Sequence, residues 1–266
     1  MRLCVLVVCV LCFNYGLCIR NRKNPRDTSR PNGVAAAVGY YEKKHAGITI
    51  PVMIHLDRAT IVKHPDIKKY RRQKSIRNYF EKVFSDVEEL FRRPSLNITV
   101  NLKLIDVKIL KKNNTKILDE NVSAYLKSYC TWQGEMKSRK HMLWYSVLFT
   151  GYDLFYLDGF GKEVRSSTGR GYMKGICSTN NSCTLLEWHP NHIAYILAHE
   201  MAHSMGVSHD GPPHNDCKPQ RHIMDAVYKP HKPAKTWSSC SRRNLRQFLT
   251  SPRAWCLLPE GKHPTL

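Results

Sequence analysis

One stretch decides the fold of this chain, His199-Glu200-Met201-Ala202-His203-Ser204-Met205-Gly206-Val207-Ser208-His209-Asp210. Histidines four residues apart, here His199 and His203, lie on one face of an α-helix, close enough to hold one metal ion, and Glu200 faces the open side of that ion. Gly206 allows a left-handed turn that ends the helix and brings His209 back as a third nitrogen ligand. Three protein ligands leave one position of zinc to water, which is typical of a catalytic site.

The alternative interpretation is an amphipathic helix with incidental histidines. The short pattern HExxH arises by chance often enough to leave both interpretations open, whereas the extended pattern HExxHxxGxxHD favours the metal site. With these residues the chain resembles the metzincin metalloproteases. Asp210, directly after the third histidine, resembles their reprolysin (adamalysin) branch, which includes snake-venom metalloproteases and the ADAM and ADAMTS enzymes.

This resemblance implies a secreted zinc-dependent endopeptidase that hydrolyses extracellular matrix or plasma proteins, with venom or saliva as a source that the family suggests. His199, His203 and His209 are the expected ligands of one Zn²⁺, and Glu200 is the expected general base that takes a proton from zinc-activated water. A second hypothesis is a basic secreted binding module for glycosaminoglycans or haemostatic proteins, with little or no proteolysis. A pseudoenzyme is disfavoured, because this chain keeps the glutamate and all three histidines.

The resemblance also assigns structural roles. Asp210 is expected to be buried and hydrogen-bonded, and Met224 matches the Met-turn, a hydrophobic floor under the zinc ligands, although Met224 alone indicates only ordinary core. The Gly-rich residues 169–175 match an antiparallel edge strand that pairs with the substrate backbone, although by themselves they indicate a loop. Family members often bind Ca²⁺. Pro51 stands where the family usually has a glutamate ligand, while Asp153 matches another ligand, so Ca²⁺ binding stays open.

Hydrophobic periodicity predicts an α/β fold class, a mostly parallel, twisted sheet with packed helices. The resemblance to the metzincin catalytic domain adds an antiparallel edge strand and a small C-terminal subdomain. The metal-binding helix is expected to begin near Pro190 and to end at Gly206. A phase shift within the second strand predicts a bulge, and Pro51 is a flaw in the first. The other expected elements are strands at 48–56, 97–110 and 146–150, and helices at 66–92, at 119–133 and through Leu245, Phe248 and Leu249.

The N-terminus has the pattern of a signal peptide over residues 1–18, with Arg2 before the apolar run Leu3–Phe13. Residues 19–46 are basic and are expected to be a flexible extension or a short propeptide; they contain no cysteine for a cysteine switch. The resemblance assigns residues 47–259 to the catalytic domain, with an upper subdomain at 47–206, a lower one at 207–259 and a tail at 260–266. No further segment is long and apolar enough to span a bilayer, so we expect a secreted, unanchored protein. We also expect a monomer that ends without the additional modules of larger family members.

Ten cysteines are present, and six remain once the predicted signal peptide is removed. An even number in an exported protein favours three disulfides, although six cysteines allow 15 connectivities. The order of the cysteines resembles that of the ADAMTS enzymes, which implies the pairs Cys130–Cys183, Cys177–Cys256 and Cys217–Cys240.

The surface chemistry is basic. The formal net charge is +21, which in an exported protein indicates acidic partners such as sulfated glycosaminoglycans, acidic proteins or anionic cell surfaces; nucleic acid lies in another compartment. The alternative is that the charge serves solubility. Four sequons are compatible with N-glycosylation, at Asn97, Asn113, Asn121 and Asn180.

Overall fold

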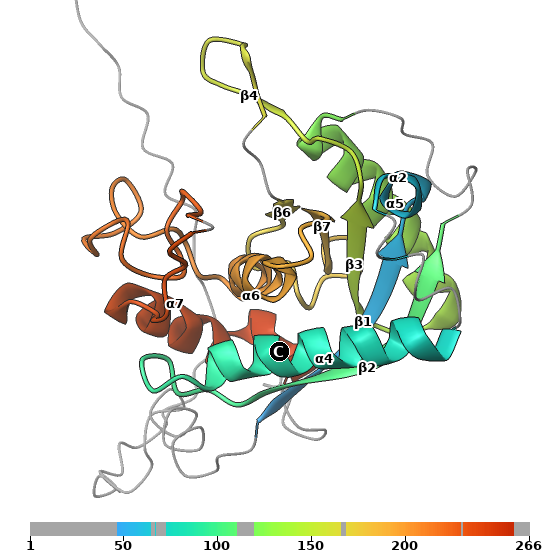
Figure 1. The fold of residues 1–266 in the computed structure, drawn as a ribbon. Coiled ribbons are helices and arrows are strands. Elements are labelled where there is room, and N and C mark those ends of the chain that lie inside the picture. Colours follow the sequence, from blue (N-terminus) through green and yellow to red (C-terminus); the bar gives the residue numbers. More distant parts are fainter. Residues whose placement is uncertain are drawn as a thin grey trace, which may run out of the picture.

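The centre of the fold is a five-stranded sheet with the strand order β2-β1-β3-β7-β6 (Figure 1). The computed structural model describes residues 47–64, 67, 73–110, 120–165, 169–229 and 231–257. Four strands are parallel, and the edge strand β6 runs antiparallel to β7, which confirms the predicted fold class. The strands are β1 (Ile48–Leu56), β2 (Val100–Ile109), β3 (Tyr145–Thr150), β6 (Gly169–Gly171) and β7 (Cys183–Glu187).

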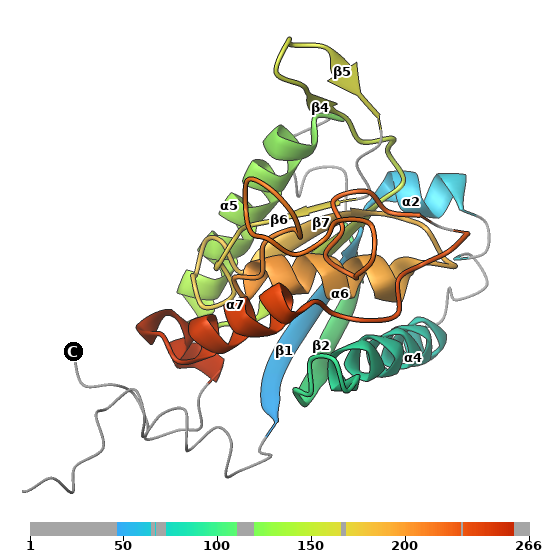
Figure 2. The ribbon, with the colours of Figure 1, turned by 90° about the vertical axis from the view of Figure 1, so that its left-hand side faces the viewer.

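Both faces of this sheet are covered by helices, and successive side chains of β3 point alternately into the two cores. Val147 and Phe149 belong to one apolar core and Leu148, between them, to the other. The helices α4 (Gln73–Arg92) and α6 (Ile193–Ser204) pack on the first face, and α5 (Val122–Lys140) packs on the second (Figures 1 and 2). A parallel sheet covered in this way needs apolar residues on both faces, and all six residues of β3 are buried.

The two irregular features expected in the strands have clear positions. The register between β1 and β2 shifts so that Val52 pairs with Leu104 and Met53 with Asp106, which leaves Ile105 as the extra residue of a bulge and confirms the prediction. Pro51 is tolerated because the pairing of β1 with β3 begins only at the next residue. At Pro51 that side of β1 is an edge, where a missing N–H breaks no ladder bond.

Three predicted helix boundaries were wrong. Helix α6 begins at Ile193, because the residues from Pro190 form a turn in which His192 N–H donates to the His189 carbonyl. Its last residue is Ser204, and the predicted left-handed turn at Gly206 follows the C-cap Met205. Helix α5 begins at Val122 rather than at 119 and runs on to Lys140, since the buried side chain of Lys137 continues its inward face after the apolar pattern stops. Helix α4 is described from Gln73 on. Its predicted start at residue 66 lies outside the described residues.

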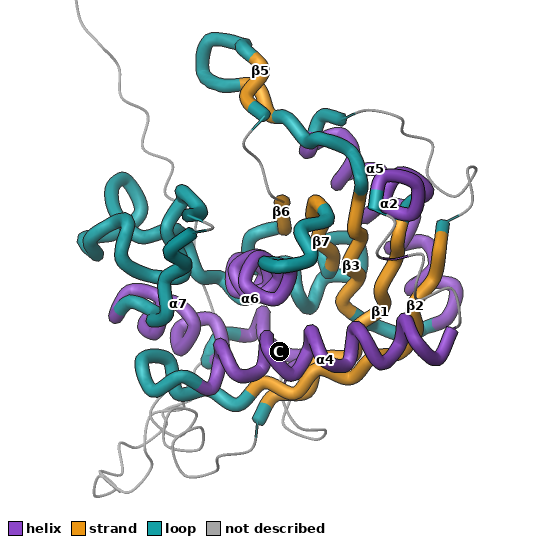
Figure 3. The backbone as a smooth tube through the Cα atoms, in the orientation of Figure 1, coloured by secondary structure: helices purple, strands orange, loops and turns teal. Residues whose placement is uncertain are grey.

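Two further helices, a hairpin and a 3-10 helix complete the frame. Helix α2 (Arg58–Lys63) was not predicted; Asp57 caps it by accepting from Thr60 N–H at 2.7 Å. The strands β4 (Tyr156–Leu157) and β5 (Glu163–Val164) form a hairpin that projects from the body (Figure 2). Helix α7 (Ser239–Leu249) follows long loop segments, which are teal in Figure 3, and the 3-10 helix η1 (Pro252–Leu257) comes directly after it.

Three disulfides tie these elements together. Cys130–Cys183 joins α5 to β7, Cys177–Cys256 joins the segment before β7 to η1, and Cys217–Cys240 joins a loop to α7. These are the pairs that the ADAMTS-like order of cysteines implies. None of the described helices is long and apolar enough to cross a membrane. The predicted signal peptide and N-terminal extension lie outside the described residues, as do the tail and Asn113.

Lys137 provides a test of the packing around α5. Its side chain is 1% exposed, its ammonium donates to the Ser182 carbonyl at 2.7 Å, and burial lowers its pKa to about 7. Between pH 7 and 10 the unfolded chain retains a proton that the folded chain has released, so this group makes the folded state more stable as pH rises. We expect the free energy of unfolding of the wild type, minus that of Lys137→Met, to rise by up to about 1.4 kcal/mol per pH unit there.

Denaturant titrations at several pH values measure this difference, and Lys140→Met, an exposed change on the same helix, controls for the loss of one positive charge. Equal pH dependence in the wild type and Lys137→Met would show that burial does not displace the proton from this amine.

Candidate metal centre

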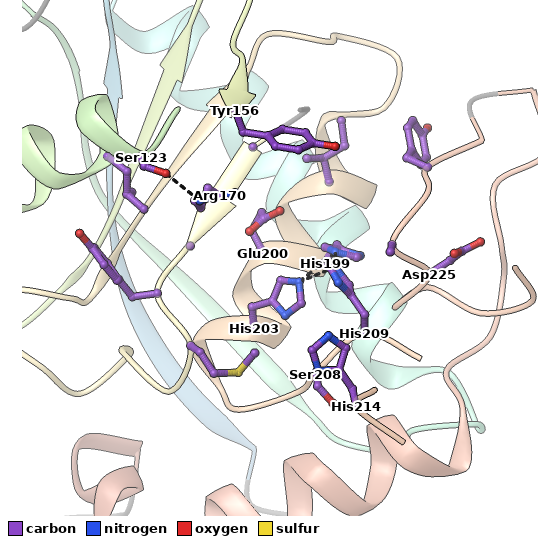
Figure 4. A pocket seen from close by; sticks show the side chains of 18 of the residues that line it. Ser123, Tyr156, Arg170, His199, Glu200, His203, Ser208, His209, His214 and Asp225 are labelled. Carbon is purple, nitrogen blue, oxygen red and sulfur yellow. Dashed lines mark hydrogen bonds between the residues drawn. The ribbon is translucent and has the colours of Figure 1, made fainter. Parts of the chain in front are cut away.

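Three imidazoles converge on one point beside helix α6. His199 and His203 are one turn apart on the helix, and Gly206, at φ +84°, turns the chain back so that His209 faces them. Their Nε2 atoms lie 3.1 Å (His199 to His203), 3.2 Å (His199 to His209) and 3.0 Å (His203 to His209) apart. Figure 4 shows the three rings close together beside Glu200. The structure thus brings together the three residues that the sequence pattern selected.

Backbone carbonyls orient two of these rings. The Nδ1 atom of His199 lies 2.8 Å from the Ile223 carbonyl and that of His203 lies 2.7 Å from the Val207 carbonyl. A carbonyl oxygen only accepts, so both Nδ1 atoms carry the proton and both Nε2 atoms present a lone pair to the point of convergence. Hydrogen bonds of this kind fix the tautomer and the orientation of metal-binding histidines.

The geometry and the charge state of the three rings fit a divalent cation. In a tetrahedral zinc site with Zn–N distances of about 2.0–2.1 Å, ligand nitrogens are about 3.3 Å apart, close to the observed separations. Burial is the main cause that lowers the pKa of each ring, to about 4 for His199 and below the ordinary value for His203 and His209. The rings are therefore neutral at neutral pH, which is the form that binds a metal.

Glu200 is the carboxylate next to this centre. Its side chain points into the same cleft (Figure 4) and the residue is only 6% exposed. Burial raises its pKa to about 7, while a hydrogen bond from the Gly171 backbone and the positive charge of Arg170 act in the opposite direction. A carboxylate with a raised pKa is a stronger base than an exposed one, which suits it to moving a proton.

The segments after the third histidine are braced by Asp210. It is 5% exposed, its Oδ1 accepts from the Ser238 hydroxyl at 2.6 Å, and its N–H donates to the Met224 carbonyl at 2.9 Å. Ser238 in turn caps α7. Met224 is fully buried, and the residue before it, Ile223, supplies the carbonyl that holds His199. This arrangement is compatible with the roles expected of Asp210 and Met224, which stay predictions.

Glu200 and the three histidines line a cleft of about 680 Å³, and sequence reasoning missed most of its other walls. Arg170 lies in residues 169–175, whose match to the family predicts backbone pairing with substrate but no role for this side chain. The ring centroid of His214 lies 6.2 Å from that of His209. The cleft residues outside the predicted site and the predicted edge strand include Ser123, Leu126, Tyr156, Tyr195, His214, Asp225 and Tyr228.

The remaining predicted sites have other surroundings. Among the described residues, the one further group with metal-ligand spacing contains Cys217 and Cys240, which are disulfide-bonded to each other. Asp153, the residue matching a family calcium ligand, lies 3.5 Å from Arg165. Ca²⁺ binding therefore gains no support here.

The described sequons differ in their surroundings. Asn97 and Asn180 are exposed, whereas the side chain of Asn121 caps α5. Glycosylation stays a prediction at all of them.

Comparison with known proteins identifies relatives of this chain. Residues 56–260 match the model of the Reprolysin (M12B) family zinc metalloprotease. The chain is 26% identical over 224 residues to "A disintegrin and metalloproteinase with thrombospondin motifs 18" of Mus musculus, an alignment that covers 83% of this chain and 17% of that protein. It is 27% identical over 213 residues to "A disintegrin and metalloproteinase with thrombospondin motifs 19" of Homo sapiens, an alignment that covers 74% of this chain and 18% of that protein. The chain thus spans about a sixth of the length of these curated relatives.

The convergence of the imidazoles predicts the metal content. We expect correctly oxidised protein, exchanged into buffer with zinc and then desalted, to retain one zinc ion per chain by mass spectrometry of the metal. His209→Ala removes one of three nitrogen ligands, so its retained zinc should fall to a small fraction of one. His222→Ala is the matched control, because His222 bonds to Thr236 at 2.9 Å and lies outside the group. A full zinc ion in His209→Ala would exclude this residue as a ligand.

Proposed function

This chain belongs to the reprolysin (M12B) family of zinc metalloproteases, and we propose that it is a secreted endopeptidase in which His199, His203 and His209 bind the metal and Glu200 moves the proton. The observation that carries this proposal is the convergence of three imidazole nitrogens, two with lone pairs set by backbone carbonyls, in a cleft that also holds a buried carboxylate. Extracellular proteins are the proposed substrates.

The proposed reaction is hydrolysis of a peptide bond. A bound zinc ion would lower the pKa of a water molecule and polarise the scissile carbonyl. Glu200 accepts a proton from the attacking water on a carboxylate oxygen and later donates it to the nitrogen of the leaving amine. Burial raises the pKa of Glu200 and makes its carboxylate a stronger base, whereas a nearby positive charge such as that of Arg170 lowers this pKa. Together the two effects keep both protonation states of Glu200 accessible.

The edge strand suits a peptide substrate. Strand β6 lies at the end of the sheet, borders the cleft and, among the strands of the described residues, pairs only with β7. An extended peptide that adds to its other side would be held by main-chain hydrogen bonds, which do not depend on substrate side chains. This placement would bring a substrate backbone alongside Glu200 and the histidines, as a protease of broad sequence tolerance requires.

The proposal is tested by Glu200→Gln, which keeps the size of the side chain but removes its basicity. We expect the variant to retain zinc and to lose at least about 10³-fold in kcat/KM on a quenched fluorescent peptide, with 1,10-phenanthroline abolishing the wild-type activity. Glu135→Gln, the same change at an exposed position of α5 outside the cleft, is the control and should retain most activity.

Wild-type cleavage rates in zinc-loaded Glu200→Gln would remove Glu200 from the mechanism. A wild-type protein that holds zinc and binds acidic glycans or plasma proteins, but cleaves no member of a proteome-derived peptide library, would favour the alternative of a basic binding module.

A further inference from the structure

The two faces of β6 differ in the space they leave for side chains. A Cβ atom on Gly171 would lie 3.2 Å from the Ser204 hydroxyl and 3.3 Å from the Glu200 carbonyl, so this face of the strand lies tightly against α6. Successive residues of a strand point to opposite faces. Arg170 therefore extends to the other face, toward the start of α5, where its Nη1 donates to the Ser123 hydroxyl at 2.7 Å.

Arg170 forms no ion pair with the described residues in this position, although its charge reaches Glu200 across the cleft. Its bonded partner is a neutral hydroxyl, and no ion pair found among the described residues includes it. A guanidinium group has five N–H donors in a planar fork, and one bond to serine leaves most of them for a ligand. The side chain is exposed, so reaching a ligand requires no rearrangement of the core.

The surroundings of Arg170 form one part of the cleft. Ser123, Leu126 and Tyr156 line this part together with Arg170. In the view of Figure 4, Glu200 lies between Arg170 and the histidines, and Tyr156 lies above Glu200. Ser123 lies in the first turn of α5, whose N-terminal end carries a partial positive charge that also favours an anion. We name this group of four residues the upper subsite.

We propose that the upper subsite selects substrates with an aspartate or glutamate at the position paired with Arg170, an inference that rests on the proposed function. Directly opposite residues of an antiparallel pair project to the same face of a sheet, so this substrate side chain would enter the upper subsite. A carboxylate there accepts two parallel N–H bonds from the guanidinium group, a geometry that amides and neutral side chains match less well. Substrates would thus be extended segments with one acidic residue near the scissile bond.

The test compares two peptides within each enzyme. A library first identifies the substrate position with the strongest acidic selection, and a pair of peptides is then made that differs only by Glu or Gln at that position. For the wild type we expect kcat/KM to be about tenfold higher for the Glu peptide, and for Arg170→Gln we expect a ratio near one. The ratio cancels any effect of the variant on Glu200 or on folding, because both peptides meet the same enzyme.

Two further variants separate a local contact from the general charge of the chain. Arg242→Gln removes one exposed positive charge from α7, outside the cleft, and should keep the wild-type ratio. Arg170→Glu should reverse the preference, so that a Lys peptide is cleaved faster than the Glu peptide. An unchanged ratio in Arg170→Gln, an equal loss in Arg242→Gln, or a wild type without acidic selection would each overturn the proposal.

Binding provides a readout that does not depend on turnover. Fluorescence anisotropy with the zinc-loaded Glu200→Gln protein should show tighter binding of the labelled Glu peptide than of its Gln partner, and Arg170→Gln introduced into the same background should remove this difference. If the zinc-loaded wild type cleaves no peptide, the proposed function fails. The binding comparison still decides the subsite: a Glu preference that depends on Arg170 supports it, and equal binding of the two peptides overturns it.

Discussion

The arrangement of the cleft depends on one electrostatic constraint, the convergence of three neutral imidazoles whose Nε2 atoms lie 3.0–3.2 Å apart. Carbonyl acceptors fix the protons of His199 and His203 on Nδ1, so the Nε2 atoms of these two rings have no proton to share with each other. Lone pairs held this close in a buried site repel one another, and a cation between them turns the repulsion into attraction. The family to which the chain belongs binds zinc, and this local chemistry fits that ion.

The constraint explains why distant segments have to be fixed. The carbonyl that orients His199 belongs to Ile223, on the far side of the loop that follows the third histidine. Asp210 fastens this loop by bonding to Met224 and to Ser238, and the Cys217–Cys240 disulfide closes the same region onto α7. A ring held by a loop is only as well oriented as the loop, so these links contribute to the geometry of the histidines without touching a metal.

The sequence was most informative where chemistry depends on spacing along one element. The interval between His199 and His203 and the left-handed turn at Gly206 are local, so pattern and structure agree there. The same holds for the bulge at Ile105, which leaves a phase shift in the strand. Helix α5 was predicted too short because Lys137 is buried, and a buried lysine has no hydrophobic signature. The upper subsite was missed for a related reason: its residues come from three elements, and only the tertiary fold brings them together.

The groups that bind the substrate backbone in this cleft differ from those that select a substrate side chain. A Cβ atom on Gly171 would crowd Ser204 and the Glu200 backbone of α6, and one on Gly169 would collide with Leu185 and Leu186 of β7. Two of the three residues of β6 therefore offer a substrate no side chain to recognise. Main-chain bonds then hold many extended peptides about equally well. Selectivity must come from the few side chains that border the strand, and Arg170 is the one that carries a charge without a carboxylate partner among the described residues. A general basic surface attracts acidic proteins at long range, whereas a single oriented guanidinium group in the cleft determines which segment of such a protein is positioned for cleavage.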